Sequence, residues 1–209
     1  MLRRYLLIAL SLGSLTVASQ VSAQTYPERP IKILQGFAPG GNADAIARAV
    51  GQEMSKGLGQ PMVVEAQAGA GGTIAATTVS KAKPDGYTLL LATGGHSVAG
   101  ALYNNLAYRT VQDFEMVSTI TYFPFLIVVP ANSKFANLSA LLATAKANPE
   151  QISYGTAGIG STHHLAGELL ASMSKTQLLH VPYRGDSGSL AALLAGDIPM
   201  IIAPPTAVM

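Results

Sequence analysis

The residues best suited to bind a ligand form a glycine-bearing loop, Phe37-Ala38-Pro39-Gly40-Gly41-Asn42-Ala43-Asp44. The loop joins a strand predicted at 31–37 to a helix predicted at 45–58. Paired glycines let a backbone approach a bound group closely, and the first N–H groups of a helix are unpaired and lie at the positive end of its dipole. The loop is therefore predicted to bind an anion without reacting with it. Asp44, directly before the helix, is interpreted as its N-cap.

A second loop of the same kind, Gly155-Thr156-Ala157-Gly158-Ile159-Gly160-Ser161-Thr162, joins a strand predicted at 152–154 to a helix predicted at 163–173. It looks superficially like a phosphate-binding loop but lacks the lysine that contacts the β- and γ-phosphates, so nucleotide hydrolysis is not expected. Two shorter glycine-bearing turns, at 68–72 and 93–97, follow strands predicted at 62–65 and 87–92. The carboxyl ends of strands are where open α/β sheets bind ligands.

One serine lies in a segment that resembles a protease nucleophile, Gly185-Asp186-Ser187-Gly188. Trypsin-like proteases are paired β-barrels, whereas this segment lies between a strand and a short helix, and no histidine motif precedes it. The G-x-S-x-G elbow of α/β-hydrolases is also absent. Ser187 is therefore interpreted as a helix N-cap, and an exported hydrolase that uses Ser187 or Ser161 is kept as an alternative.

The remaining polar side chains point to binding rather than to a metal or a cofactor. His164 and Glu168 are four residues apart on one helical face beside His163, but no third ligand is evident, so neither a metal nor a cofactor is expected. His180 is interpreted as a structural residue or a single hydrogen-bond donor. Arg184 is equally consistent with a guanidinium that pairs with a ligand carboxylate and with a solvent-exposed charge.

The elements that position these loops alternate between short apolar runs and helical patterns, which predicts an α/β fold with a mainly parallel sheet. In the helix at 45–58, Ile46, Val50, Met54 and Leu58 recur at every fourth position and indicate one apolar face. A lobe boundary near Tyr122 divides the chain into a first α/β lobe, 24–122, and a second, 123–209. Further helices are predicted at 73–82, 138–147 and 188–194, with Asn137 as a cap, and further strands at 125–129, 178–181 and 200–203.

The chain begins with an export signal, predicted at residues 1–23. Two arginines precede an apolar run at 6–17, and Val21-Ser22-Ala23 is a small-residue cleavage site. The run is shorter than the roughly 20 residues that span a bilayer, so no stable membrane anchor is expected. We therefore predict export to a periplasm.

The charge balance excludes nucleic acid as a partner. The signal holds two of the 13 Lys and Arg and none of the 11 Asp and Glu, which leaves 11 of each. No basic patch remains to bind a phosphate backbone. Only 11% of residues are charged, against about 25% in typical domains. An anionic ligand is therefore expected to be held mainly by backbone N–H groups.

Several ordered segments together resemble one family. They are Tyr26-Pro27-Glu28-Arg29-Pro30-Ile31, the loop FAPGGNAD, GAGG at 69–72, KPDGYTLL at 83–90, and SYGTAGIGSTHHLAGELL with HVPYRG at 153–185. This set is similar to the Bug-type (TctC-like) solute-binding receptors of tripartite tricarboxylate transporters. The resemblance implies a two-lobed periplasmic-binding-protein fold, also called a Venus flytrap, that closes on a small carboxylate. It also implies that the receptor, expected to be a monomer, delivers its ligand to membrane permease subunits.

The resemblance also implies which residues contact the ligand. One wall of the site would comprise Phe37, Ala38, Pro39, Gly40, Gly41 and Asp44. The other would comprise Thr156, Gly158, Gly160, Ser161 and His164, with Gly71, Gly72, Thr93 and His96 as flanking candidates. Nothing in these motifs requires catalysis.

The sequence departs from the family pattern in two places. Ala203 stands where members often carry an acidic residue, and the C-terminal return to the first lobe is missing, so a truncated chain is expected. An inactive gene fragment is therefore kept as an alternative to a transport receptor. A sensor for a membrane kinase is a further alternative, because sensing would need the same closure.

Overall fold

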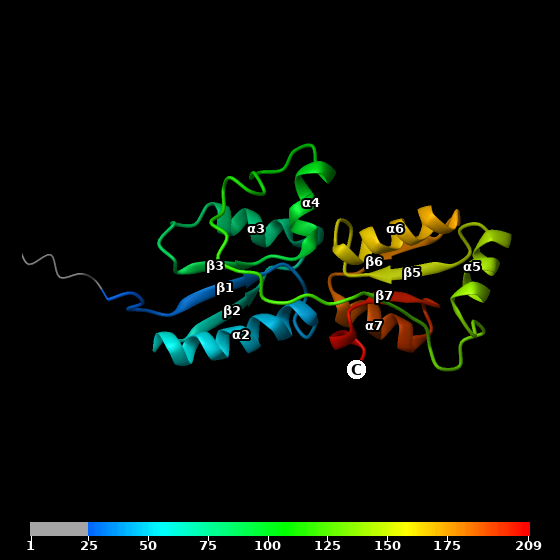
Figure 1. Cartoon of the computed structure of the whole chain (residues 1–209), viewed down its shortest axis with the longest axis horizontal. Helices are drawn as coiled ribbons and strands as arrows, with labels where there is room; N and C mark the ends of the chain where they lie inside the picture. The colour runs from blue at the N-terminus through cyan, green and yellow to red at the C-terminus, as the bar shows by residue number, and fades with distance from the viewer. Residues whose placement is uncertain (1–24) are drawn as a thin grey trace, which may run out of the picture.

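The computed structural model describes residues 25–209, arranged as two α/β lobes side by side (Figure 1). The predicted signal at 1–23 lies outside the described residues. The first lobe contains a three-stranded sheet of order β2-β1-β3, and the second a four-stranded sheet of order β4-β7-β5-β6. All pairs are parallel except β4 with β7, which are antiparallel. The prediction of an α/β fold is confirmed. Within residues 25–209, no helix is both long enough and apolar enough to cross a membrane.

The first lobe is wound on both faces of its sheet, with α2 on one face and α3 on the other (Figure 1). Its elements are β1 (Ile31–Gln35), α2 (Asn42–Leu58), β2 (Met62–Ala66), the 3-10 turn η1 (Ala70–Gly72), α3 (Thr73–Ser80), β3 (Thr88–Leu91) and α4 (Gly94–Leu102).

Helix α2 approaches the sheet through small residues. Ala43, Ala47 and Gly51 are buried, and a Cβ on Gly51 would lie 3.2 Å from Cβ of Met62. Ile46, Val50 and Met54, which were predicted to form the apolar face, are only partly buried and lie beside these small residues. Leu58 is exposed. A close helix–sheet contact therefore shifts the buried face of α2 away from its largest side chains.

The second lobe comprises β4 (Leu126–Val128), α5 (Leu138–Ala147), β5 (Ser153–Thr156), α6 (Thr162–Ser174), β6 (Leu179–Pro182), α7 (Asp186–Ala195), β7 (Ile201–Ala203) and the 3-10 turn η2 (Pro205–Ala207). Alternate residues of β7 face opposite layers, as the period of a strand requires. Ile202 packs with Leu141 of α5 and Tyr154, whereas Ile201 packs with Leu193 of α7. This sheet is therefore buried on both faces.

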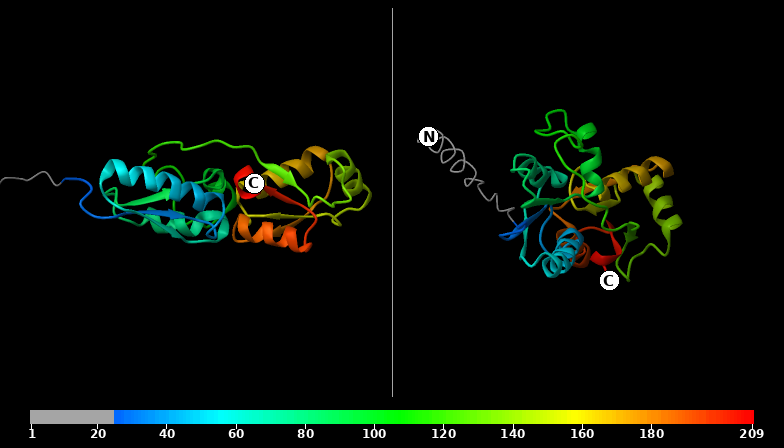
Figure 2. Two further views of the ribbon diagram at one scale, coloured as in Figure 1. Left: turned by 90° about the horizontal axis from the view of Figure 1, so that it is seen from below. Right: turned by 60° about the vertical axis from the view of Figure 1, so that its left-hand side comes forward.

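Residues 103–125 connect the two sheets and run across the junction between the lobes (Figure 2). The predicted boundary near Tyr122 falls in this segment and stays a prediction. The described C-terminal end also lies at the junction (Figure 2), where the Thr206 hydroxyl donates to the side-chain oxygen of Asn42. The C-terminal contact places the second lobe against the start of α2.

The predicted starts of two helices were wrong, and a third helix was not predicted. Helix α2 begins at Asn42 with Gly41 as its N-cap, so Asp44 lies in its first turn and is not the cap. Helix α7 begins at Asp186 after Gly185, so Ser187 is inside the helix and is not its N-cap. The turn predicted at 93–97 is the start of α4, where Ala99 and the His96 ring are buried and override the weak helix propensity of Gly94.

Candidate ligand-binding site

The loops that follow the strands of the two sheets meet at the junction. The β1–α2 loop contacts the β6–α7 loop, because the Ala38 N–H donates to the Arg184 carbonyl at 2.9 Å. The Ser187 hydroxyl donates to the Pro39 carbonyl at 3.3 Å. The β1–α2 loop is also in contact with the β5–α6 loop, since Phe37 and Ala43 pack against Ala157, so the two glycine-bearing loops predicted to bind an anion meet here.

The β1–α2 loop is held in place by side chains of its own lobe. The Phe37 N–H donates to Oε1 of the buried Gln35 at 2.8 Å. Asp44 Oδ2 accepts from the Gly40 N–H at 3.2 Å and from Arg48 Nε at 3.0 Å. The Arg48 guanidinium and the Gly40 N–H outweigh the effect of burial and hold the pKa of Asp44 below its usual range. Asp44 therefore shapes the loop as a carboxylate.

The amino terminus of α2 already contacts a carboxylate, and it comes from the other lobe. Asp186 Oδ2 accepts the Asn42 N–H at 2.9 Å, and Asp186 is only 6% exposed. Its Oδ1 lies 2.7 Å from Nε2 of His163, although the His163 N–H is not aligned with it as in a well-formed hydrogen bond. Burial alone would raise the pKa of Asp186, but His163 and the Asn42 N–H outweigh it and lower this pKa.

The β5–α6 loop uses its polar side chains to hold its own backbone. Ser161 is fully buried and caps α6, accepting the His164 N–H at 3.3 Å and donating to the Gly158 carbonyl at 2.6 Å. Thr156 Oγ1 accepts the Gly158 N–H at 3.1 Å. Nδ1 of His164 accepts the Gly160 N–H at 3.3 Å. Ser161, Thr156 and His164 thus orient the loop whether or not they also contact a ligand.

Two histidines stack beside this loop. The rings of His164 and His180 are 4.1 Å apart, and Nε2 of His180 lies 2.6 Å from Thr156 Oγ1. Burial, and then the charge of His164, lower the pKa of His180 to about 4. The Tyr154 hydroxyl donates to Glu168 at 2.7 Å. Within residues 25–209, no group of three or more His, Cys, Asp or Glu side chains is placed to hold a metal ion.

The lobes approach each other through glycines that leave no room for a side chain. A Cβ on Gly71 would lie 2.6 Å from the Ile159 carbonyl, and one on Gly95 would lie 2.7 Å from the Gly160 carbonyl. A Cβ on Gly185 would lie 2.9 Å from the Ala38 nitrogen. These distances are shorter than real Cβ contacts, so glycine is required at these positions for the lobes to be this close.

An apolar contact and a tyrosine complete the junction. Phe37 and Ala43 of the first lobe form a buried cluster with Ala157 of the second. The Tyr103 hydroxyl donates to the Ile159 carbonyl at 3.2 Å. The first and second lobes are therefore in direct contact on several sides of the facing loops.

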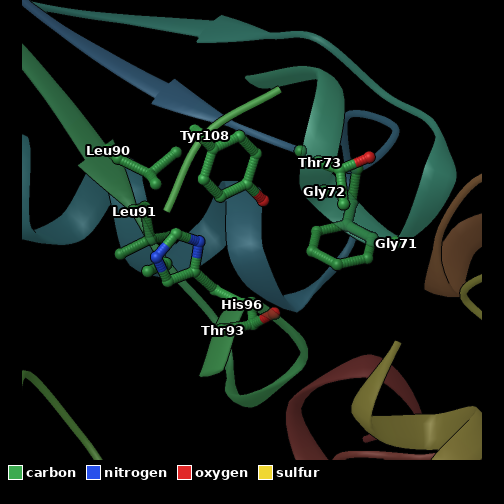
Figure 3. A pocket seen from close by; sticks show the side chains of 11 residues that line it. Gly71, Gly72, Thr73, Leu90, Leu91, Thr93, His96 and Tyr108 are labelled. Carbon is green, nitrogen blue, oxygen red and sulfur yellow. The ribbon is translucent and has the colours of Figure 1, made fainter. Parts of the chain in front are cut away.

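A cavity of about 10 Å³ lies in the first lobe beside the junction, close to the smallest volume that holds one water. It is lined by Phe37, Gly71, Gly72, Thr93, His96 and Tyr108, among others (Figure 3). The buried His96 has Nε2 2.9 Å from the Thr110 carbonyl, and its ring stacks on Tyr108. Its Nδ1 and the Tyr108 hydroxyl have no hydrogen-bond partner. Burial raises the pKa of Tyr108, so this hydroxyl stays protonated.

The structure thus brings most of the predicted residues to one junction, but in different environments. Gly41 and Gly158 are buried there, whereas Pro39 and Gly40 are exposed. The Arg184 side chain is also exposed, and only its carbonyl reaches the other lobe.

Sequence reasoning missed four residues that contact the junction or its cavity: His163, Asp186, Tyr103 and Tyr108. Asp186 was interpreted only as a neighbour of Ser187. His163 was interpreted as a capping or ligand-contacting histidine in preference to a metal ligand, but its partner was not predicted. The aromatic Tyr103 and Tyr108 lie in a stretch without clear periodicity, which gave no signal of their position.

Two α/β lobes that meet at the carboxyl ends of their sheets define a two-lobed periplasmic-binding-protein fold. The family model of the tripartite tricarboxylate transporter family receptor (TctC) matches residues 46–209. The chain therefore belongs to this receptor family, as the resemblance predicted. A relative from Pseudomonas sp. strain P51, the UPF0065 protein in the tcbD-tcbE intergenic region, is 39% identical over 96% of this chain and 60% of its own length.

Solved structures of similar sequence have the same fold. The periplasmic binding protein BugD is 36% identical with a TM-score of 0.82, over 87% of this chain and 60% of BugD. An R. palustris protein with adipate is 31% identical with a TM-score of 0.83, over 87% of this chain and 61% of that one. MatC from Rhodopseudomonas palustris, with bound malate, is 35% identical with a TM-score of 0.80, over 86% of this chain and 61% of MatC.

The chain spans about 60% of the length of the relatives and structures that it matches. The family and these structures are substrate-binding receptors rather than enzymes.

Proposed function

We propose that this protein is an exported receptor that captures a small organic carboxylate between its lobes and delivers it to the permease of a tripartite tricarboxylate transporter. The observation that carries the proposal is the meeting of two glycine-bearing loops, each followed by a helix, at one junction. Structures with adipate and with malate among the similar proteins support a carboxylate as the ligand.

The chemistry of the junction suits an anion. The amino termini of α2, α6 and α7 all lie there, each with the positive end of a helix dipole, although the Asn42 N–H is paired with Asp186 and the His164 N–H with Ser161. The Arg184 side chain at the end of β6 is exposed, so the ligand would be held mainly by backbone groups of the β1–α2 and β5–α6 loops. The residues proposed to contact it are those of the two predicted walls and their flanks, named above.

Closure of the two lobes around the ligand would exclude water and strengthen these hydrogen bonds. The glycines at the junction permit such closure, since larger residues would hold the lobes apart. A ligand the size of malate or adipate needs more space than the cavity of about 10 Å³, so the lobes must separate to admit it and close again afterwards.

A serine hydrolase is not supported by the positions of the serines. The Ser161 hydroxyl is buried and donates to the Gly158 carbonyl, and the Ser187 hydroxyl donates to the Pro39 carbonyl. Neither is therefore held by a histidine that would accept its proton. A sensor for a membrane kinase would use the same closure, and co-purification with a permease subunit or with a kinase ectodomain would distinguish the two roles.

Isothermal titration calorimetry of the purified chain tests the ligand class. Malate and adipate are titrated first, with the uncharged diamide of adipate as a matched control. The proposal predicts saturable binding of at least one dicarboxylate and none of the diamide. Equal binding of both, or no binding of any carboxylate by a chain with a cooperative unfolding transition, would contradict it.

A further inference from the structure

We propose that Asp186 is an affinity-determining residue, because its carboxylate holds the amino terminus of α2 and must be displaced by a carboxylate ligand that binds there. The inference rests on the proposed function. It goes beyond that function by identifying an anion within the chain that competes with the ligand.

The position of Asp186 supports this competition. Its Oδ2 lies 2.9 Å from the Asn42 nitrogen, and a Cβ on Gly41 would lie 3.1 Å from the same oxygen. These are the residues of the β1–α2 loop that would otherwise receive an anion. The carboxylate lies among the first turns of three helices, because Asn42 begins α2, Asp186 begins α7 and His163 belongs to the first turn of α6. The positive dipole ends of α2 and α7 therefore stabilise its charge, and the His163 ring of α6 lies beside it.

Other charged groups near this position are already paired within their own lobe. Asp44, also in the first turn of α2, accepts from Arg48 and from the Gly40 N–H. Among the described residues, His163 is the one Lys, Arg or His side chain with a nitrogen within 4 Å of the Asp186 carboxylate. Asp186 is therefore the only carboxylate among the described residues that is seen to accept an N–H from the α2 terminus across the junction.

Since Asp186 belongs to the second lobe, its hydrogen bond also fastens the lobes together. It acts beside the bonds from Ala38 to Arg184 and from Ser187 to Pro39. A ligand carboxylate that replaces Asp186 at the Asn42 N–H must break this link and provide its own. The measured binding free energy is then the difference between the contacts that the ligand forms and the Asp186 contact that it breaks. A monocarboxylate, which forms only one such contact, should therefore bind poorly.

Removing the charge of Asp186 should therefore strengthen ligand binding. Since Asn keeps the size of the side chain but removes the competing charge, we expect malate or adipate to bind about tenfold more tightly to Asp186→Asn, a difference of about 1.4 kcal/mol. Asp186→Ala is a second variant that removes the acceptor as well. Asp197→Asn removes the same charge from the exposed turn that follows α7 and is the matched control.

Calorimetry with malate and adipate compares the unchanged chain with these three variants, after circular dichroism has shown the same helix content in each. Tighter binding by Asp186→Asn, with Asp197→Asn unchanged, supports the proposal. Unchanged or weaker binding by both Asp186 variants overturns it, because weaker binding would mean that Asp186 contacts the ligand or supports the site.

The spacing of the lobes gives a readout that needs no ligand. The chain has no cysteine, so spin labels can be placed at Glu53→Cys in α2 and Leu194→Cys in α7, both exposed. Without ligand, Asp186→Asn should give a longer and broader distance distribution than the labelled parent. An identical distribution would show that Asp186 does not hold the lobes together, and would overturn that part of the proposal. If no chain binds any carboxylate, the proposed function fails, and the distance measurement alone still decides whether Asp186 fastens the lobes.

Discussion

Ser161 shows how the polar side chains at the junction are used. It is completely buried, caps α6 through the His164 N–H and donates to the Gly158 carbonyl. A hydroxyl with both functions satisfied has little freedom to act as a nucleophile. Its main effect is to fix the conformation of the β5–α6 loop before any ligand binds, which lowers the entropy cost of binding.

Replacing Ser161 by Ala should lower the free energy of unfolding by about 1 kcal/mol, because a helix cap is lost. Urea denaturation followed by circular dichroism measures the change. Ser187→Ala, at an exposed hydroxyl, is the control and should change the free energy by less than about 0.5 kcal/mol. An equal effect of the two substitutions would contradict the role assigned to Ser161.

His180 should titrate far below a free histidine, because burial and the neighbouring His164 lower its pKa to about 4. The folded state then binds fewer protons than the unfolded state between pH 4 and about 6.5, the ordinary histidine pKa. Its contribution to stability is complete above about pH 6.5 and is lost as the pH falls toward 4. Proton NMR of the ring would measure the titration, and a midpoint near 6.5 would disprove the prediction.

Several residue-level features were predictable because they depend on neighbours in sequence. Asn137 caps α5 as expected, since its side chain needs only the Ala140 N–H three residues on. Asp186 was missed because its partner Asn42 is 144 residues away. No local pattern indicates which carboxylate will meet a distant helix terminus. Asp44 was predicted to be the N-cap of α2, but it lies about one turn inside the helix. The N-cap is Gly41, which has no side chain that would identify it as a cap in the sequence.

At the level of elements, clear start and stop signals in the sequence decided which bounds could be predicted. Helix α5 has the predicted bounds, Leu138–Ala147, because an asparagine cap and an Asn-Pro stop enclose it. Strands β3 and β5 shifted by one or two residues at their ends. Helix α4 was missed because its first residues are two glycines, and its formation depends on tertiary contacts of His96 and Ala99.

Gly95 in α4 offers a test of closure. A Cβ there would lie 2.7 Å from the Gly160 carbonyl of the other lobe, so Gly95→Ala should keep the lobes apart and weaken dicarboxylate binding by about tenfold or more. The fold itself should be kept or stabilised by up to about 1 kcal/mol, since alanine favours a helix. Calorimetry and thermal unfolding measure the two effects separately.

Gly100→Ala is the matched control for this variant. It lies on the same helix, and its Cβ would meet Thr110 at an ordinary 3.6 Å. Binding by this variant should equal that of the unchanged chain. If Gly95→Ala also binds normally, the contact between α4 and the β5–α6 loop is not part of the closed state that holds the ligand.

At the scale of the whole molecule, the two sheets have separate cores, and their loops meet at a junction rich in glycine. The Phe37, Ala43 and Ala157 cluster joins the lobes, whereas Leu141 and Leu193 belong to cores on opposite faces of the second sheet. The alternation of strands and helices predicted the α/β class, whereas the two-lobed fold was implied by the family resemblance. The contacts between the lobes were not predictable in detail, because they arise only after both lobes have folded.

The most direct measurement is an amide NMR titration of the isotopically labelled chain with malate and with adipate. The account predicts that saturating shifts appear first at the N–H groups of Gly41, Asn42, Gly158 and Gly160, on both sides of the junction, with the same dissociation constant at all four. Shifts confined to one lobe, or found only at sites distant from these loops, would contradict a carboxylate site between the lobes.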